Sequence, residues 1–131
     1  MGTRIQKQDL LYPELSYEIV GSLFAVHNEL GGEQLERVYQ KAIAQELIKK
    51  KIPFQEQFEV VVIYKNEKVG QYYLDFLIAD KIVLEIKKDK RFSPNDIRQT
   101  LAYLKSADLK LGILANFTKQ AVQFKRIVNL K

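Results

Sequence analysis

Residues 73–87, with the sequence Y-L-D-F-L-I-A-D-K-I-V-L-E-I-K, decide how the rest of this chain can fold. Two apolar runs, residues 72–79 and 82–86, are separated only by Asp80 and Lys81, a spacing typical of a tight β-hairpin. Both runs are apolar at nearly every position, which is typical of strands that lie inside a sheet and are covered on both faces. We therefore expect this hairpin to form the centre of the fold.

Successive side chains of a strand point to opposite faces of the sheet, so the hairpin sequence also predicts which residues share a face. In the first strand Asp75 shares a face with Tyr73 and Leu77. In the second strand Glu85 shares a face with Val83 and Lys87. The opposite faces are predicted to hold Leu74, Phe76 and Ile78 in the first strand, and Ile82, Leu84 and Ile86 in the second.

Asp75, Glu85 and Lys87 are ionisable groups in strands that are otherwise apolar. Burying an unpaired charge costs about several kcal/mol, so some interaction should compensate. A divalent cation held by Asp75 and Glu85, with Lys87 beside it, would do so. An ion pair between Glu85 and Lys87 on a partly solvated face, with Asp75 at a fraying strand end, is the alternative. These residues alone leave both interpretations open.

The composition indicates one folded domain that spans residues 1–131. Hydrophobic residues make up 47% of the 131 positions, and there are only three prolines. The chain has no cysteine, which excludes disulfides and thiolate sites, and its single histidine excludes a multi-histidine metal site within one chain. No segment resembles a signal peptide or is apolar for long enough to cross a membrane, so we expect a cytoplasmic location.

The net charge of +5 is unevenly distributed along the chain. Residues 1–80 contain 9 Lys and Arg against 12 Asp and Glu, whereas residues 81–131 contain 12 against 4. A basic second half that begins beside the candidate metal site predicts a polyanionic partner such as nucleic acid. A lysine-rich solvated surface, which is common, explains the charge equally well.

Hydrophobic periodicity and turn residues predict the order α-α-β-β-β-α-β-β, an α+β or α/β sandwich with one mixed sheet. After a polar arm at residues 1–10, helices are expected near residues 12–30 and 33–50. Strands follow at 54–64, 68–79 and 82–86, with a turn at 65–67. A helix begins at the Ser93-Pro94 signal, and a buried strand at 109–115 precedes a turn at 116–118. The alternation of residues 122–128 predicts a final edge strand, although a short helix also fits.

Two polar side chains occupy positions next to predicted apolar stripes. Glu36 lies three, seven and eleven positions before Tyr39, Ile43 and Leu47, so it shares their helix face and is either a capping group or an active-site acid. His27 borders the apolar face of the first helix, where a hydrogen-bonded histidine at the edge of the core is favoured over a catalytic one.

The ordered set of short stretches in this chain resembles the PD-(D/E)XK nuclease superfamily, and within it the small prokaryotic proteins of the GxxExxY family. The D-x9-E-x-K spacing of Asp75, Glu85 and Lys87 resembles the superfamily signature. The resemblance extends over nearly the whole chain through V-H-N-E-L-G at 26–31, E-R-V-Y at 36–39, V-G-Q-Y-Y-L-D-F-L-I at 69–78, L-E-I-K at 84–87, Q-T-L-A-Y-L-K at 99–105, L-G-I-L-A-N-F at 111–117 and K-R-I-V at 125–128.

This resemblance implies a restriction-endonuclease-like αβββαβ core with an extra N-terminal helix. It also implies that Asp75 and Glu85 bind a divalent metal, Mg²⁺ or Mn²⁺, together with the carbonyl of Ile86, and that Glu36 binds it directly or through water. Lys87 would position or activate the attacking water. Gln99 would orient groups at the site.

The chain departs from the family pattern at one position. The glycine expected three residues before Glu36 is Glu33, and Gly31 and Gly32 lie just upstream. The turn into the second helix is therefore expected to differ, with an additional carboxylate near Glu36.

A magnesium-dependent nuclease that hydrolyses DNA phosphodiester bonds is the leading hypothesis. A nucleic-acid-binding module with little activity and an interaction subunit with a relic site are the alternatives, since fold kinship does not establish activity. Cutting both strands of a duplex would most simply use two sites, which makes a homodimer plausible. In the basic half, the residues expected to contact phosphates are Lys88, Lys90, Arg91, Arg98 and Lys105.

Overall fold

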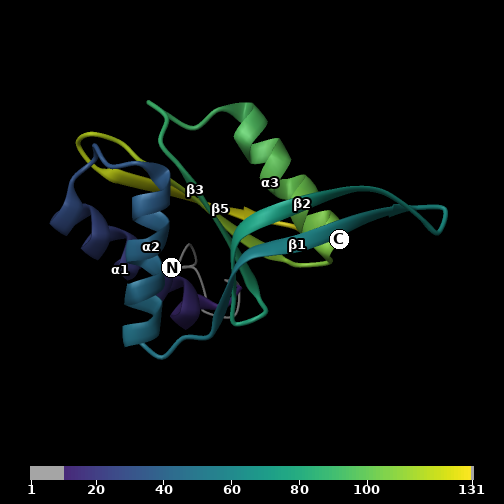
Figure 1. Ribbon diagram of the computed structural model, residues 1–131, viewed down its shortest axis with the longest axis horizontal. Helices are drawn as coiled ribbons and strands as arrows, with labels where there is room; N and C mark the ends of the chain where they lie inside the picture. Colours follow the sequence, from purple (N-terminus) through teal and green to yellow (C-terminus); the bar gives the residue numbers. More distant parts are fainter. Residues whose placement is uncertain (1–10, 131) are drawn as a thin grey trace, which may run out of the picture.

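Five strands form one mixed sheet in the order β1-β2-β3-β4-β5 in the computed structural model, which describes residues 11–130 (Figure 1). Neighbouring strands are antiparallel except β3 and β4, which pair in parallel. The predicted N-terminal arm, residues 1–10, lies outside the described residues. The strands are β1 (Phe54–Tyr64), β2 (Glu67–Ile78), β3 (Ile82–Lys87), β4 (Leu111–Phe117) and β5 (Val122–Val128).

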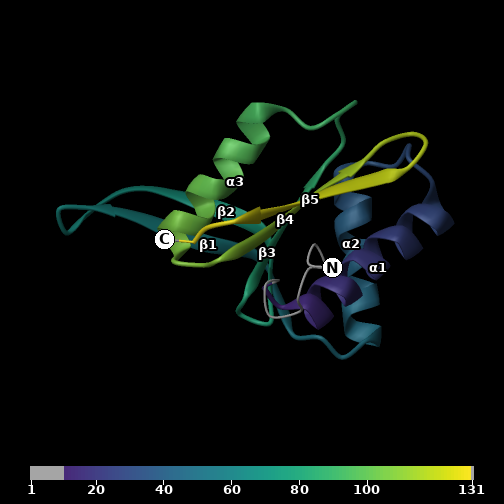
Figure 2. The same cartoon turned by 180° about the vertical axis from the view of Figure 1, so that it is seen from behind.

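Three helices cover the two faces of this sheet, as the two opposite views show (Figures 1 and 2). Helices α1 (Pro13–Leu30) and α2 (Glu36–Lys49) pack on one face, and α3 (Pro94–Ala107) packs on the other. The element order and the mixed α/β architecture predicted from the sequence are confirmed. Within residues 11–130, no helix is both long and apolar enough to cross a membrane.

Each face of the sheet has its own apolar cluster. The larger cluster joins α1 and α2 to residues such as Phe76, Leu84 and Ile113 of the central strands. The smaller one joins Leu104 of α3 to side chains such as Val83. Burial on both faces explains why β3 and β4 are apolar at almost every position, without the alternation of a strand that faces water on one side.

Local signals set the ends of the helices. Pro13 begins α1, and Gly31, with a φ of 76°, ends it in the left-handed region that glycine adopts without strain. At the start of α3 the side chain of Ser93 accepts a hydrogen bond from the backbone N–H of Asp96, while the Asp96 carboxylate accepts one from the N–H of Ser93. These reciprocal bonds form a capping box, as the Ser93-Pro94 signal predicted.

The prediction of a two-residue turn at Asp80 and Lys81 is wrong by one residue. Ile78 pairs directly with Ile82, so Ala79 belongs to a three-residue turn. Ala79 and Asp80 both have positive φ angles, of 53° and 57°, and the N–H of Lys81 donates to the carbonyl of Ile78 at 2.9 Å. The alanine continues the apolar run in the sequence, and this concealed the end of the strand.

A second correction concerns the faces of β2. Leu74 was predicted to share a face with Phe76, but Leu74 packs in the α3 cluster and Phe76 in the α1 and α2 cluster. The faces exchange at Asp75, where the β1–β2 ladder has a gap between the pair Phe58–Leu74 and the pair Glu56–Phe76; Gln57 is the β1 residue in this gap. Gln57 has a φ of 50°, an uncommon conformation for a residue with a side chain, and it interrupts the regular alternation of β1.

The third correction is at the end of β4. Asn116 and Phe117 were expected in a turn, yet both are buried strand residues, and the turn follows them. The side chain of Asn116 accepts from the N–H of Asp89 at 2.7 Å and donates to the Asp89 carbonyl at 2.8 Å. A distant backbone thus satisfies an amide that would otherwise be costly to bury. The C-terminal segment is a strand, as its alternation predicted, and not a short helix.

Tyr39 fixes the loop between α1 and α2, and with it the start of α2. Its hydroxyl donates to the carbonyl of Gly31 at 2.6 Å and accepts from the N–H of Gln34 at 3.1 Å. Its fully buried ring stacks on Phe117 with a centroid separation of 4.1 Å. The same side chain therefore packs in the core and holds both ends of the loop that precedes Glu36.

We predict that Tyr39→Phe lowers the free energy of unfolding by about 1–2 kcal/mol, because two backbone groups of the loop lose a buried partner. Urea denaturation of the two proteins measures the difference. The control is Tyr64→Phe near the tip of the β1–β2 hairpin, where the side chain is exposed and the loss should be within about 0.5 kcal/mol. Equal stabilities for the Tyr39 variant and the wild type would contradict the role assigned to the hydroxyl.

Candidate active site at a fork in the sheet

The predicted site residues lie where β2 separates from β3. The two strands pair only through three residue pairs, from Ile78 with Ile82 to Phe76 with Leu84. Beyond them β2 continues with β1, and β3 continues with β4. The sheet therefore forks at Asp75 and Glu85, the first residues past the last shared pair.

Asp75 and Glu85 replace the missing strand pairing at this fork. The backbone N–H of Asp75 donates to Glu85 Oε2 at 2.9 Å, and the backbone N–H of Ile86 donates to Asp75 Oδ2 at 2.7 Å. Buried backbone N–H groups need partners, and diverging strands would leave these two without any. The two carboxylates are thus held side by side, each by the backbone of the other strand.

Burial raises the pKa values of both carboxyl groups, and the charge of Asp75 raises that of Glu85 further. Glu85 is only 7% exposed, and burial, followed by the charge of Asp75, raises its pKa to about 8. The pKa of Asp75 is also raised, mainly by burial and against the hydrogen bond from Ile86. In the metal-free chain Glu85 is therefore mostly protonated at neutral pH, which keeps two like charges from being buried together.

The start of α2 brings Glu36 into the electrostatic field of the fork. The side chain of Glu36 is exposed, but partial burial of its carboxyl group, followed by the charge of Asp75, raises its pKa, while Lys87 acts in the opposite direction. The negative charge of Glu36 also raises the pKa of Glu85. Tyr39, Ile43 and Leu47, the residues predicted to share its stripe, are all fully buried.

Lys87 lies at the end of β3 between the carboxylates and α3. Its positive charge lowers the pKa values of Asp75, Glu85 and Glu36. Its described ion pair is with Asp96 Oδ1 at 3.9 Å, and not with Glu85. Glu85 is also buried and Asp75 is not at a strand end, so the alternative of a solvated Glu85–Lys87 pair beside a fraying strand is wrong.

Two glutamines that the sequence analysis did not single out support Asp75. Gln40 of α2 and Gln57 of β1 lower its pKa through side-chain hydrogen bonds, and Gln57 Nε2 donates to Gln40 Oε1 at 3.5 Å. Gln40 follows Glu36 by four positions, a spacing that places both on one helix face. This spacing could have predicted from the sequence that Gln40 lies near the site. Gln57 had no comparable signal, because only the irregular backbone of β1 brings it opposite Asp75.

Tyr103 of α3 is a further neighbour of the fork. Its ring lies 4.6 Å from that of Tyr72 between centroids, and burial, followed by the charge of Glu85, raises its pKa to about 12. Gln99, the predicted orienting residue, is exposed one turn earlier on the same helix. Gln99 and Tyr103 are four positions apart and therefore share a helix face, and the pKa shift of Tyr103 indicates that this face is turned toward the carboxylates.

The predicted phosphate contacts occupy two elements after β3. Lys88, Lys90 and Arg91 lie in the loop between β3 and α3, where Lys88 is half-buried and the other two are exposed. Arg98 and Lys105 are exposed on α3. These positive side chains thus lie on the two elements that follow Lys87 along the chain.

The donor set at the fork fits a cation that retains bound water. Among residues 11–130, no three Asp, Glu, His or Cys side chains are arranged to hold a metal ion, so Glu36 does not complete a three-carboxylate site. Mg²⁺ commonly binds one or two carboxylates and keeps several waters, a coordination that Asp75 and Glu85 suit. Burial raises the pKa values of these two groups, so a cation between them would offset the cost of ionising them there.

His27 and the cavity at the other end of the hairpin lie apart from this chemistry. The carbonyl of Thr118 accepts a hydrogen bond from His27 Nε2 at 2.9 Å, which confirms the prediction of a hydrogen-bonded histidine at the core edge.

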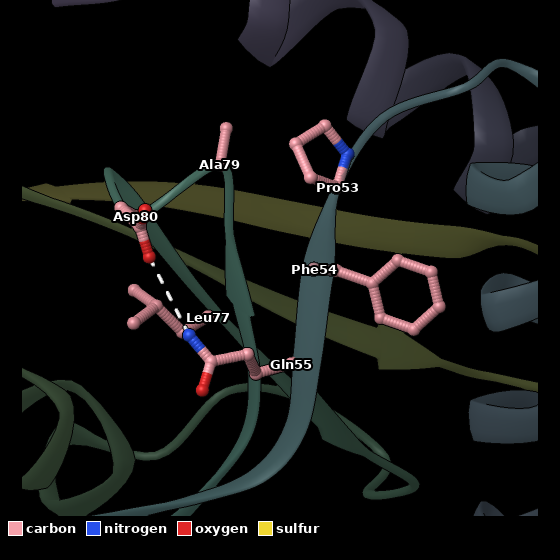
Figure 3. A pocket seen from close by; sticks show the side chains of 6 residues that line it. All are labelled: Pro53, Phe54, Gln55, Leu77, Ala79 and Asp80. Atoms are coloured by element: carbon pink, nitrogen blue, oxygen red, sulfur yellow. Dashed lines mark hydrogen bonds between the residues drawn. The ribbon is translucent and has the colours of Figure 1, made fainter.

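A cavity of about 140 Å³ lies between the start of β1 and the β2–β3 turn (Figure 3). Its one side-chain hydrogen bond in that view joins Gln55 Nε2 to Asp80 at 3.4 Å, and no carboxylate pair faces it.

Comparisons with known proteins agree with this geometry. The family model described as the PD-(D/E)XK nuclease superfamily matches residues 13–127. The crystal structure of SSO0001 is similar with a TM-score of 0.59 and 16% identity, over 97% of this chain and 71% of that one. The crystal structure of an alkaline exonuclease (LHK-Exo) from Laribacter hongkongensis is similar with a TM-score of 0.53 and 13% identity, over 95% and 72% of the two chains. No curated protein sequence matches the chain.

The raised pKa of Glu85 predicts how the stability of the metal-free protein depends on pH. The folded state holds this proton more tightly than the unfolded state, in which the pKa of the glutamate is near 4.5. The free energy of unfolding that depends on this proton is therefore fully present below pH 4.5 and is lost as the pH rises through about 8. In EDTA, the melting temperature should fall by roughly 5 °C between pH 6 and pH 8.5.

Glu85→Gln should remove most of this dependence, because the amide does not ionise. Glu56→Gln, at an exposed position of β1, is the control and should keep the wild-type dependence. Thermal melts followed by circular dichroism at the two pH values measure the effect. A Glu85→Gln protein that loses as much stability as the wild type would contradict the assignment.

Proposed function

The chain belongs to the PD-(D/E)XK nuclease superfamily, and on that premise we propose that it is a divalent-metal-dependent nuclease that hydrolyses phosphodiester bonds in DNA. The observation that carries this proposal is the pair of carboxylates at the fork, each fixed by the backbone of the opposite strand, with Lys87 next to them. Within the superfamily we assign the chain to the GxxExxY branch, on the stretches quoted above. The buried hydroxyl of Tyr39 gives the tyrosine of that motif a physical role.

Asp75 and Glu85 would hold Mg²⁺ or Mn²⁺, with the carbonyl of Ile86 as a third donor. Of the two roles expected for Glu36, direct binding or binding through water, the arrangement of the described carboxylates favours binding through water. When bound, the cation lowers the pKa of a water molecule and offsets charge on the phosphate. As a ligand of that cation Glu85 would be ionised, so it would give up the proton that it holds in the metal-free chain. The hydrogen bonds of the two carboxylates to the backbone fix their separation before any ligand arrives, which limits reorganisation during the reaction.

Lys87 would act on the phosphate or on the attacking water. The ion pair with Asp96 holds its ammonium group near the start of α3 and away from direct pairing with Glu85. A positive charge so placed stabilises negative charge that develops on the phosphate oxygens. Asp96 is in turn fixed by the capping box of α3, so it is a positioning residue for Lys87. Gln99 would orient substrate groups from the exposed side of α3.

The substrate strand would follow the loop after β3 and the exposed side of α3. These elements carry five positive side chains (Lys88, Lys90, Arg91, Arg98 and Lys105) against two acidic ones, Asp89 and Asp96, an excess that favours a polyanion. A cytoplasmic location suits this substrate. A homodimer would supply a second active site for the other strand of a duplex.

We predict that Mn²⁺ binds the wild type and that Asp75→Asn weakens this binding by tenfold or more, because one of two charged ligands is lost. Isothermal titration calorimetry at pH 7 measures the affinity, and repeating it in two buffers of different ionisation enthalpy measures the proton released from Glu85. The control is Asp80→Asn, which removes an exposed aspartate from the hairpin turn and should bind like the wild type. Equal affinities for the Asp75 and Asp80 variants would remove the fork from consideration as the metal site.

We predict that Lys87→Ala lowers the rate of DNA cleavage by roughly a hundredfold or more, the effect expected for removal of an electrostatic catalytic group. Metal binding and DNA affinity should change only modestly. Cleavage of duplex, single-stranded and branched DNA in Mg²⁺ and in Mn²⁺ tests this, with Lys81→Ala before β3 as the control. If the purified wild type cuts none of these substrates, the nuclease proposal fails and a nucleic-acid-binding module takes its place.

A further inference from the structure

We propose that a cavity beside the fork binds a second, non-scissile phosphate of a nucleic-acid strand, an inference that rests on the proposed function. The cavity has a volume of about 310 Å³ and lies between the loop after β3 and the turn between β4 and β5. Three lysines line it: Lys88, Lys90 and Lys119. We call it the lysine pocket. Lys119 and this pocket were not among the sites predicted from the sequence.

The first wall of the lysine pocket is the loop that carries Lys88 and Lys90. The fully buried side chain of Asn116 fixes it by bonding both the N–H and the carbonyl of Asp89, at 2.7 and 2.8 Å. Two hydrogen bonds from one rigid amide hold the backbone between the two lysines in one conformation. The position of the positive charges is therefore set by the core of the protein.

The second wall is the β4–β5 turn that carries Lys119. His27 Nε2 donates to the carbonyl of Thr118 at 2.9 Å, which ties this turn to α1. Gly32 presses against the same turn, since a Cβ on Gly32 would lie 2.0 Å from the Thr118 carbonyl oxygen. Both opposite views show this turn, the α1–α2 loop and the loop after β3 at the same end of the sheet (Figures 1 and 2).

The charge of the pocket indicates an anion. Three lysines and one acidic residue, Asp89, line the pocket, which leaves an excess of positive charge. Lys119 is paired at 3.7 Å with Glu33, and both side chains are largely exposed, so the pair is weak and a phosphate could replace the carboxylate. Glu33 stands where the family pattern has glycine, and here it competes for the pocket.

The pocket adjoins the reaction centre, which identifies the anion as part of the same strand. Lys88 directly follows Lys87, and the charges of Lys88 and Asp89 both act on Glu36. The volume is at the lower end of the range of roughly 300–1,000 Å³ typical of small-ligand sites, and a phosphate with part of its sugar suits it. A strand held here and at the fork would be fixed at two points, which orients the scissile bond.

The test measures binding of a labelled oligonucleotide by fluorescence anisotropy in EDTA, so that cleavage plays no part. Lys90→Ala and Lys119→Ala should each weaken affinity about three- to tenfold. Each should also lower the slope of log affinity against log salt by about 0.7 on single strands or about 0.9 on duplex. Glu33→Gln should instead strengthen binding about twofold. Lys49→Ala, at the opposite end of α2 from Glu36, is the matched control and should bind like the wild type.

The source of the phosphate is resolved by comparing linear oligonucleotides that carry a 5′-phosphate, a 3′-phosphate or hydroxyls at both ends with a closed circle. If the lysine variants lose affinity only for an oligonucleotide with a terminal phosphate, the pocket binds a strand end. If they lose it equally for the circle, the pocket binds an internal phosphodiester. Either result supports the proposal.

The proposal is overturned if Lys90→Ala and Lys119→Ala bind every oligonucleotide as Lys49→Ala does. Cleavage by the wild type separates this failure from failure of the proposed function. A wild type that cuts DNA while the lysine variants bind normally retains the nuclease proposal and loses the pocket. A wild type that cuts nothing while the lysine variants bind weakly retains the pocket and loses the nuclease.

Discussion

The exchange of hydrogen bonds between Asp75 and Glu85 is the constraint on which the site depends. Where β2 and β3 part, two backbone N–H groups lose their strand partners, and each finds a carboxylate from the other strand. These hydrogen bonds fix the positions of the two carboxylates, and the carboxylates in turn satisfy the two backbone N–H groups. Because neither can change without leaving a buried polar group unpaired, the fork is both a structural joint and the place where a cation fits.

The joint is electrostatically unfavourable without a ligand. Burial raises the pKa of Glu85 to about 8, and the folded chain tolerates the pair at neutral pH by keeping a proton there. Lys87, the nearest compensating charge, is shared with Asp96 at the start of α3. The folded protein is therefore less stable because of Asp75 and Glu85, the residues suited to binding a catalytic cation. Such a loss of stability is common where activity requires a strained or unpaired group.

Several polar side chains in the core or at its edge position loops, and those loops carry the charged groups. Tyr39 holds the loop that leads to Glu36, and Asn116 holds the loop that carries Lys88 and Lys90. His27 holds the β4–β5 turn. Each satisfies backbone groups from a distant segment, so the core extends its order to the surface that would meet a substrate. Their value to function is indirect, through the conformation of loops that have no regular structure of their own.

The sequence by itself determined the element order and the Asp75, Glu85 and Lys87 cluster, because strand alternation, helix periodicity and turn residues are local signals. It also placed Glu36 on the helix face of Tyr39, Ile43 and Leu47, although Glu36 itself, at the start of α2, is exposed. Only the tertiary structure decided the rest: the change of faces at Asp75, the burial of Asn116, the contributions of Gln40 and Gln57, and the lysine pocket. Each of these depends on a partner far away in the chain, or on a backbone irregularity such as the positive φ of Gln57, and neither leaves a periodic trace in the sequence.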